Sequence, residues 1–343
     1  MLGGLLSASP AVAVGMIVVT TAVILVGSGW LESSAEQLSA HYGLPPVIQG
    51  SIVVAVGSSF PELASVVVTA RAGVFDMGVG GIVGSAIFNI LVIPAVAGLA
   101  ATGNLETNRE LVYKEAQFYM IAVAALLITF ALGVIYIPAP DTPPLSGQVT
   151  RPLAIIPLLL YGLYLFIQWQ DVSEYTGGIE LSDAIGRQWA TLAGGLLLIL
   201  VGVEQLVAAV EFLTHTFGIP EFLAGVTVIA AVTSLPDTLV SVRAAREGRG
   251  LTSLGNVLGS NTFDLLVAIP IGVLLIGTVS INFAVAVPMF GVLTLATVLL
   301  FGFLRTDLSL TTPEAYALLL AYGLFILWVI AETIGVINLV AAA

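Results

Sequence analysis

The chain of 343 residues is 58% hydrophobic and only 9% charged, with a mean hydropathy of +1.10. This composition excludes a water-soluble domain, and the long apolar runs indicate a polytopic membrane protein in a lipid bilayer. The net charge of −12 argues against nucleic acid as a partner, and the lack of cysteine excludes disulfides, thiol catalysis and cysteine metal sites.

Ten membrane-spanning helices are predicted from the apolar runs, because a helix of about 20 residues crosses a bilayer core. The first five are expected near residues 10–31, 46–70, 80–101, 112–137 and 152–170. The second five are expected near residues 188–212, 221–244, 255–278, 281–304 and 314–336. The acidic segment 171–187 separates the two sets, and we expect it to be a cytoplasmic linker.

The basic residues of the loops predict the orientation in the membrane. If the N-terminus is outside, seven of these residues lie in cytoplasmic loops, and only Arg71 and Arg151 lie outside. Cytoplasmic loops carry an excess of Lys and Arg. We therefore expect a multi-pass protein of the cell membrane with both termini extracytoplasmic.

The two halves of the chain match each other under one constant shift of the sequence. Without a gap, Pro45 falls on Pro220 and Glu62 falls on Asp237. We therefore predict a duplicated unit, with one five-helix repeat in residues 1–170 and the other in residues 188–343. Because an odd number of spans inverts the second copy, the predicted fold is all-α, with ten transmembrane helices as two inverted five-helix repeats.

A proline followed by an acid interrupts one apolar run in each copy, in the stretches GSSFPEL and TSLPDTL. Pro61 and Pro236 lack an N–H and clash with the carbonyl four residues earlier, so each helix is predicted to break at the centre of the fold. The freed carbonyls have to line a protein interior or a watery cavity. Glu62 and Asp237 follow directly. Hydroxyl groups flank these acids at Ser58, Ser59, Thr233 and Ser234.

The next span of each copy adds a second polar residue at the same distance from the acid, Asn89 in the first copy and Asp264 in the second. Carboxylate, carbonyl and hydroxyl oxygens are the ligands that hard cations such as Ca²⁺ and Na⁺ prefer. The two histidines lie at helix ends, which disfavours zinc or copper. The pattern predicts one four-cornered oxygen site for hard cations.

Ion exchange follows from the charge of this site. An ionised acid at the middle of a membrane costs about 3 kcal/mol or more, and no Lys or Arg stands in these helix centres to balance it. Bound cations or protons must therefore neutralise the cluster, and an empty site would disfavour the passage between inward-open and outward-open states. Ca²⁺ and Na⁺ would compete for the same oxygens, which couples their movements.

The motifs GSSFPEL with GGIVGSAIFN, and VTSLPDTLVS with GNVLGSNTFD, resemble the two alpha-repeats of the calcium/cation antiporter superfamily, the sodium/calcium exchangers. They cover residues 45–97 and 220–272. The resemblance implies the ten-span inverted fold and exchange of Ca²⁺ for Na⁺ by alternating access. We expect no enzymatic activity, no bound cofactor, no large regulatory insertion after the fifth span, and a monomer.

Carried over residue by residue, the resemblance implies that Glu62, Asn89, Asp237 and Asp264 surround the central ion site. It implies that hydroxyl or backbone oxygens come from Ser58, Ser59, Ser85, Thr233, Ser234 and Ser260. The copies differ where Gly81 and Ala86 stand opposite Asn256 and Asn261. We assign no ligand role to these two asparagines.

Alternatives to this function stay open. Similar proteins with the GSNxFD motif include K⁺-dependent sodium/calcium exchangers, and H⁺/Ca²⁺ exchange is a further possibility. A cation channel, from a different class, would also use acidic rings. An intramembrane aspartyl protease is disfavoured, because neither aspartate lies in a Gly-x-Gly-Asp setting.

Each copy also carries a pair of glycines spaced by four residues. Gly80 with Gly84, and Gly255 with Gly259, match the small-xxx-small pattern of tightly packed membrane helices. We therefore predict close helix contacts at both pairs.

Overall fold

The computed structural model describes residues 9–43, 55–139, 145–171 and 185–337. The elements of the first half are α2 (Pro10–His41), α4 (Ala55–Ser58), α5 (Phe60–Ala72), α6 (Phe75–Leu91), α7 (Ile93–Ala100), β1 (Leu105–Glu106), η2 (Leu111–Glu115), α8 (Ala116–Tyr136), β2 (Ser146–Thr150) and α9 (Arg151–Asp171). The elements of the second half are α10 (Ile185–Phe217), α11 (Glu221–Ala224), η3 (Gly225–Ile229), α12 (Ala230–Thr233), α13 (Leu235–Arg246), α14 (Gly250–Phe263), η4 (Asp264–Ala268), α15 (Ile269–Ile276), β3 (Thr278–Asn282), α16 (Phe283–Arg305), β4 (Ser309–Leu310) and α17 (Thr312–Thr333). The segments named η are π-helical turns.

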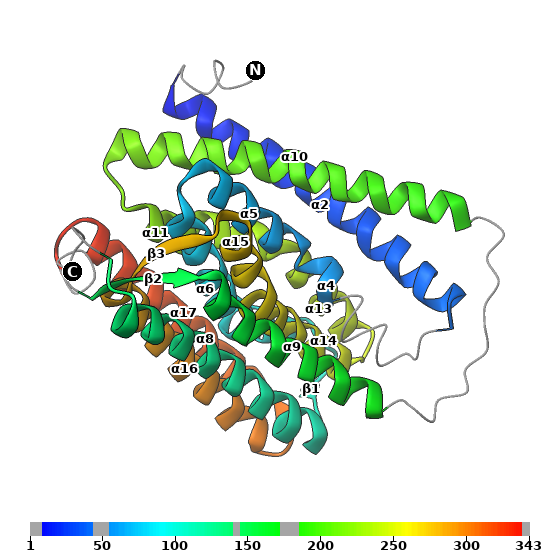
Figure 1. Ribbon diagram of the computed structural model, residues 1–343. Helices are drawn as coiled ribbons and strands as arrows, with labels where there is room; N and C mark the ends of the chain where they lie inside the picture. Colours follow the sequence, from blue (N-terminus) through cyan, green and yellow to red (C-terminus); the bar gives the residue numbers. More distant parts are fainter. Residues whose placement is uncertain (1–8, 44–54, 140–144, 172–184, 338–343) are drawn as a thin grey trace.

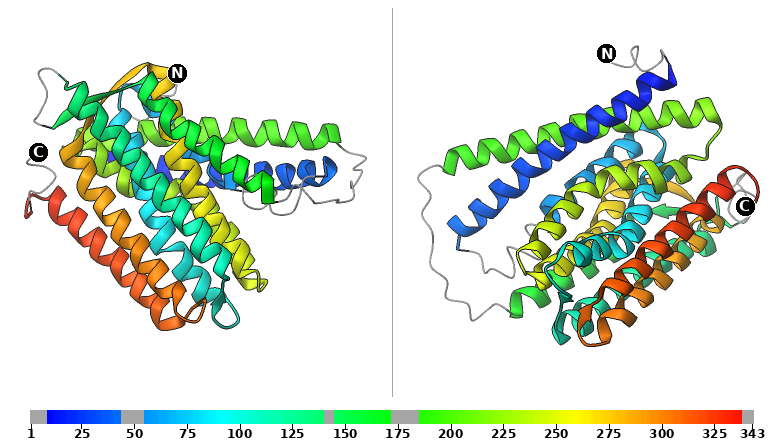
Figure 2. Two further views of the ribbon diagram at one scale, coloured as in Figure 1. Left: turned by 60° about the horizontal axis from the view of Figure 1, so that its bottom comes forward. Right: turned by 180° about the vertical axis from the view of Figure 1, so that it is seen from behind.

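The helices form a central group of short, broken segments with long helices on either side. The two longest, α2 and α10, lie along each other on one flank (Figure 1). The helices α8, α16 and α17 lie on the opposite flank, with α16 and α17 outermost (Figure 2). Between the flanks lie the short helices α4 to α7 and α11 to α15, so the interrupted segments occupy the interior of the protein.

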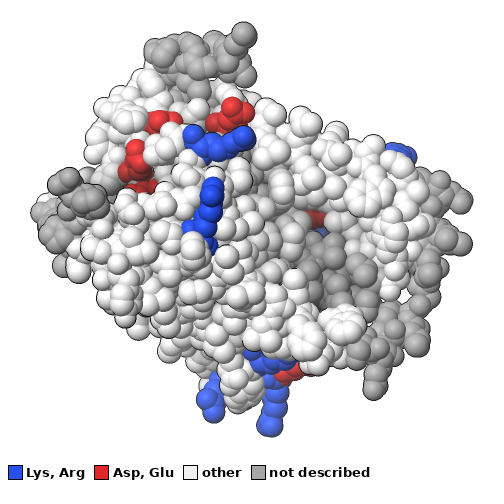
Figure 3. All heavy atoms as spheres, viewed as in Figure 1, with Lys and Arg blue, Asp and Glu red and all other residues white. Residues whose placement is uncertain are grey.

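The helices that the structure describes are sufficient for a multi-pass membrane protein. Eight of them are long and apolar enough to cross a bilayer, and the bent pair Glu221–Thr233 and Leu235–Arg246 makes nine if it counts as one span. The expected span 46–70 begins outside the described residues, so the tenth span stays a prediction. On the face seen in Figure 3, most acidic and basic side chains gather at the upper left and at the bottom, and most of the surface between these groups is uncharged.

Prolines restart the broken helices. The helices α5, α7, α13 and α15 each carry a proline in their first turn, namely Pro61, Pro94, Pro236 and Pro270. Proline suits this place because its missing N–H would have no partner there. The predicted break before Pro236 is confirmed as a bend of 44° between α12 and α13.

The element boundaries repeat with the same constant offset as the sequence. The end of α4 and the starts of α5 and α6 correspond in this way to the end of α12 and the starts of α13 and α14. The register then changes by one residue, because Pro94 follows Asn89 by five positions whereas Pro270 follows Asp264 by six. The π-helical turn η4 begins at Asp264 and accommodates the extra residue.

Two short antiparallel sheets accompany the helices of this mostly α-helical fold. Strand β1 pairs with β4, and β2 pairs with β3 through Ser146–Asn282 and the four following residue pairs. Each sheet therefore joins an element of the first half to an element of the second half. Backbone groups at the ends of the helices satisfy one another in this way. Strand β3 also has the alternation typical of a strand, because Val279 and Ile281 are buried and the polar residues beside them are more exposed.

Glycines allow the closest contacts in the interior. A Cβ atom on Gly80 would collide with the backbone of Phe222, and one on Gly84 would collide with the backbone of Val226. The prediction of close packing is thus confirmed for the first pair. A Cβ atom on Gly255 would meet no atom of the described residues within 4 Å, and close packing at the second pair stays a prediction.

Candidate cation-binding site

The ten residues predicted for the ion site all lie in the interior, and none has more than 1% of its surface exposed. Glu62 and Asp237 each occupy the third position of a helix that restarts after the break, α5 and α13. The positive end of a helix dipole stabilises a carboxylate at that position. Asn89 lies on α6, and Asp264 begins η4, at the end of α14.

Each of the first two acids accepts a hydrogen bond from a serine of its own copy. Ser85 Oγ donates to Glu62 Oε1 over 3.2 Å, and Ser260 Oγ donates to Asp237 Oδ1 over 2.9 Å. In both cases the serine follows the acid by 23 residues. The matching sequence motifs therefore fold into matching local contacts.

Other hydrogen bonds join the two copies. Ser85 and Ser234 share a bond of 2.7 Å between their hydroxyls, and Asn89 Nδ2 donates to Asp237 Oδ2 over 3.0 Å. Ser58 and Ser260 are joined more loosely, at 3.4 Å. These hydrogen bonds form two groups, one of Glu62, Ser85 and Ser234 and the other of Ser58, Ser260, Asp237 and Asn89, and each group combines side chains from both halves of the chain.

Three of the predicted residues contribute differently. Thr233 Oγ1 donates to the carbonyl of Ile229 over 3.0 Å, so this hydroxyl bonds to its own helix. Both oxygens of Asp264 are buried without a hydrogen-bond partner in the part of the chain that the structure describes. The hydroxyl of Ser59 lies beside Asp264, but it completes no hydrogen bond of normal geometry with the described residues.

Several oxygens of the cluster face no donor. Among the described residues, the buried and unpartnered oxygens of this cluster are Glu62 Oε2, Asn89 Oδ1, Ser59 Oγ, Asp264 Oδ1 and Asp264 Oδ2. A buried acceptor without a partner is costly, and a bound cation would satisfy such oxygens. All five are oxygens, which is the donor chemistry of Ca²⁺ and Na⁺ sites and not of zinc or copper sites.

The carboxylates alone do not complete a metal site. Within the described ranges, no three His, Cys, Asp or Glu side chains are arranged to hold one ion by themselves. Glu62, Asp237 and Asp264 are nevertheless close enough to repel one another. An ion in this cluster would therefore need the amide and hydroxyl oxygens as well as the carboxylates.

Two residues of the cluster were missed by the sequence reasoning. Asn256 Oδ1 accepts a hydrogen bond from Ser58 over 3.4 Å, and its Nδ2 donates to Ser241 over 3.2 Å. Asn261 Oδ1 accepts from Asn89 Nδ2 over 3.0 Å. The first copy has Gly81 and Ala86 at the positions of these two asparagines. This difference between the copies was the sequence signal for a specific contact.

Comparison with known proteins identifies the family. The family model described as sodium/calcium exchanger protein matches residues 12–170 and 187–331, which is most of the chain. The protein belongs to the sodium/calcium exchanger family. Membership places it among the multi-pass membrane antiporters of Ca²⁺ and other cations, which are transporters and not catalysts.

Relatives of the exchanger occur in bacteria, archaea and animals. A putative antiporter, CaxA, of Alkalimonas amylolytica is 28% identical over 269 residues, which cover 75% of this chain and 81% of the relative. The sodium/calcium exchanger MaX1 of Methanosarcina acetivorans is 25% identical and covers 71% of this chain and 77% of its own. Human sodium/potassium/calcium exchanger 5 is 26% identical, and the match covers 71% of this chain and 66% of the relative.

A solved structure supports the exchanger fold. The sodium-calcium exchanger NCX_Mj matches with a TM-score of 0.64 and 21% sequence identity, over 92% of this chain and 97% of its own. At that identity the likeness concerns the fold alone.

Proposed function

We propose that this exchanger is a secondary active antiporter that exchanges Ca²⁺ for Na⁺ by alternating access at the polar cluster. The main support is the charge of the cluster. Glu62, Asp237 and Asp264 are buried together, and the sequence has no Lys or Arg in residues 55–70, 75–100, 230–242 or 250–276. Transported cations would supply the missing positive charge.

The exchange follows from the need for neutrality. One Ca²⁺ or several Na⁺ each reduce the repulsion among the carboxylates, whereas the empty cluster keeps its full negative charge in a low-dielectric interior. The empty form therefore crosses between its two open states only at high cost. A protein with this restriction returns across the membrane only with another cation bound, which is countertransport.

The paired broken helices provide the moving parts in this proposal. The two copies are inserted in opposite directions, so that α5 with α6 and α13 with α14 enclose the ions from opposite sides. The repeated boundaries and the bend before Leu235 support this arrangement. Both chain ends lie outside the cell, in line with the distribution of Lys and Arg in the loops.

A K⁺-dependent form of exchange is the second candidate. Asp264 is an acid where the first copy has Asn89, and its two oxygens are unpartnered among the described residues. One further cation could be carried at this additional charge. The similarity to human sodium/potassium/calcium exchanger 5 supports the same candidate.

Radioactive Ca²⁺ flux in proteoliposomes tests the proposal. The purified protein is reconstituted, and Na⁺, H⁺ and K⁺ gradients are imposed separately. We expect an outward Na⁺ gradient to drive Ca²⁺ uptake, whereas a H⁺ gradient alone does not. Uptake driven by H⁺ but not by Na⁺ would replace the proposal with H⁺/Ca²⁺ exchange. Ca²⁺ movement without any ion on the opposite side would indicate a channel.

A further inference from the structure

The orientation of the Asn89 amide depends on a hydrogen-bonded chain that crosses between the two copies. Asn89 Nδ2 donates to Asp237 Oδ2 and to Asn261 Oδ1, each over 3.0 Å. Asn261 Nδ2 in turn donates to the carbonyl of Ala86 over 3.2 Å and to the hydroxyl of Tyr119 over 3.3 Å. Both asparagine side chains are completely buried.

The acceptors at the two ends of this row of hydrogen bonds, the Ala86 carbonyl and the Asp237 carboxylate, fix the donor and the acceptor of each hydrogen bond between them. The Ala86 carbonyl can only accept a hydrogen bond, so the end of Asn261 that faces it must be the NH₂ group. The other end of Asn261 is then an oxygen, which can only accept from Asn89. The ionised carboxylate of Asp237 also only accepts, so it likewise requires the NH₂ group of Asn89.

Asn89 is thereby held with its amide oxygen pointing away from these partners. Asn89 Oδ1 is buried and has no hydrogen-bond partner within the described part of the chain. Without Asn261, only Asp237 would oppose rotation of this amide, which would exchange its oxygen and nitrogen. An NH₂ group in the place of the oxygen would face a cation with hydrogen atoms and repel it.

We propose that Asn261 is a positioning residue, which keeps the oxygen of Asn89 directed toward the transported cation and itself binds no ion. This inference rests on the proposed function of the polar cluster. The sequence difference between the copies agrees with it, because Ala86 stands where the second copy has Asn261. A second asparagine at position 86 is not needed, since the backbone carbonyl of Ala86 already supplies the acceptor.

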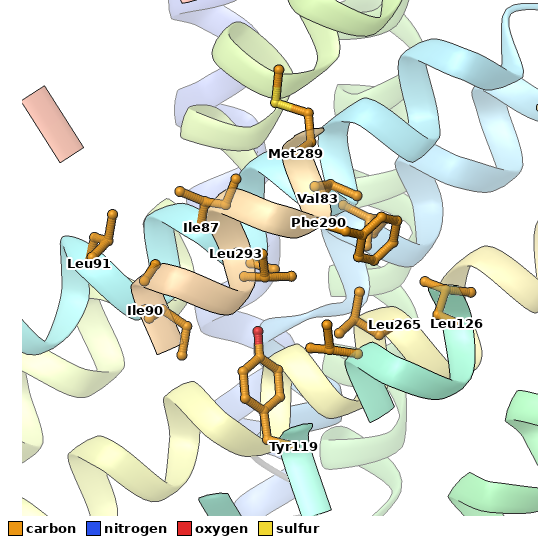
Figure 4. Packing of buried hydrophobic residues seen from close by; sticks show 14 of the residues in the cluster. Val83, Ile87, Ile90, Leu91, Tyr119, Leu126, Leu265, Met289, Phe290 and Leu293 are labelled. Carbon is orange, nitrogen blue, oxygen red and sulfur yellow. The ribbon is translucent and has the colours of Figure 1, made fainter. Parts of the chain in front are cut away.

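Packing keeps the outer end of the chain in place. Tyr119 is completely buried, and Figure 4 shows its ring among apolar side chains that include Ile90, Leu265 and Leu293. Its hydroxyl is the second of two acceptors for the Asn261 amide. The Ala86 carbonyl alone is therefore enough to fix the direction of these hydrogen bonds, and Tyr119 only makes the Asn261 side chain more rigid.

Equilibrium binding of radioactive Ca²⁺ to the purified protein tests the proposal, with the rate of Na⁺-driven uptake measured beside it. We expect Asn261→Ala to weaken Ca²⁺ binding roughly threefold to tenfold, the effect of one lost hydrogen bond, with little change in the maximal uptake rate. The decisive comparison repeats this substitution in an Asn89→Asp background. A carboxylate has an oxygen at both ends, so its orientation needs no control.

In the Asn89→Asp background, Asn261→Ala should leave Ca²⁺ binding unchanged or strengthen it, since it removes an amide oxygen that faces the new carboxylate. An equal loss in both backgrounds would overturn the proposal, because it would indicate a direct ligand or a general loss of structure. Tyr119→Phe should weaken binding less than Asn261→Ala, and a loss as large would also overturn it.

Tyr164→Phe is the matched control, because Tyr164 is a buried tyrosine whose hydroxyl donates to Glu115 outside the cluster. It should bind Ca²⁺ like the unsubstituted protein, and a loss equal to that of Asn261→Ala would contradict the proposal. Normal Ca²⁺ binding without Na⁺-driven uptake would refute the proposed exchange but still test the role of Asn261. Binding of neither Ca²⁺ nor Na⁺ would refute both.

Discussion

Glu62 and Asp237 occupy equivalent positions of the two copies, and each accepts a hydrogen bond from the serine 23 residues further along the chain. The equivalence ends there. Asp237 also accepts from Asn89, whereas the second oxygen of Glu62 has no partner among the described residues. The two acids therefore occupy similar backbone positions but differ in how fully the protein satisfies them.

Removing either charge should stop transport. We expect Glu62→Gln and Asp237→Asn to reduce Na⁺-driven Ca²⁺ uptake roughly 100-fold or more, because an unbalanced charge in the membrane costs about 3 kcal/mol. Both changes conserve shape, so the fold should survive. Glu36→Gln is the control, since Glu36 is exposed and should transport normally. Near-normal uptake in both site variants would remove the cluster as the ion site.

The two serines should not be equally important. Ser85→Ala deprives Glu62 of its serine donor, whereas Ser260→Ala leaves Asp237 with the bond from Asn89. A hydrogen bond to a charged group contributes about 1.5–3 kcal/mol. We therefore expect Ser85→Ala to lower the apparent Ca²⁺ affinity about tenfold or more, and Ser260→Ala to lower it less. Concentration series of Ca²⁺ uptake would measure both, and the opposite ranking would contradict the account.

Asp264 should determine the dependence on K⁺. Asp264→Asn gives the second copy the same residue as Asn89 and removes one negative charge without breaking a hydrogen bond among the described residues. We expect Ca²⁺ uptake to continue more slowly, and any stimulation of the unsubstituted protein by K⁺ to disappear. Uptake measured with and without K⁺ tests this expectation. Stimulation that persists in the variant would exclude Asp264 as its cause.

Substitution of Gly80 by alanine should lower the stability of the fold, whereas the same substitution at Gly255 should not. Gly80→Ala forces a methyl group against the backbone of Phe222, and we expect it to reduce the free energy of unfolding by about 1–3 kcal/mol. A methyl group at the equivalent Gly255 meets no atom of the described residues within 4 Å, so Gly255→Ala should be neutral or slightly stabilising. Thermal unfolding in detergent measures both. Equal losses would show that the methyl group is not the cause.

The repeated motifs made much of the cluster predictable. Identical offsets place Pro61 and Pro236 at the same point of two helices, and proline imposes a break there whatever surrounds it. The breaks and the burial of the neighbouring acids follow from that local chemistry. The contact of Ser85 with Ser234 does not follow from the duplication, because Ser260, the equivalent of Ser85, contacts Ser58 instead.

The remaining contacts could not be read from the sequence. Asn261 donates a hydrogen bond to the backbone carbonyl of Ala86. Every residue has a backbone carbonyl, so the residue type at position 86 does not reveal this contact. The pairing of β2 with β3 likewise depends on distant backbone groups that meet only after the helices pack. The helix α2 continues to His41, well beyond the predicted end of the first span, because hydropathy detects a membrane span and not the end of a helix.

The spacing of two prolines did carry a signal that repeat comparison alone overlooks. Pro270 lies one residue later than the position of Pro94 predicts, and the structure places a π-helical turn in that interval. A single inserted residue in a helix commonly forms such a turn. The acid Asp264 is located at its start. An irregular spacing within an otherwise strict repeat thus indicated where the copies differ in backbone as well as in charge.

In the repeat arrangement proposed above, Ala86 and Asn261 are equivalent positions, and they touch. Residues that touch their own equivalents lie on the pseudo-two-fold axis. An assembly of two identical chains would be obliged to carry the same side chain on both sides of that axis. In a single polypeptide the two positions can differ. The side-chain amide of Asn261 can therefore bond to the backbone carbonyl of Ala86 at the axis, where two identical chains would carry the same residue twice.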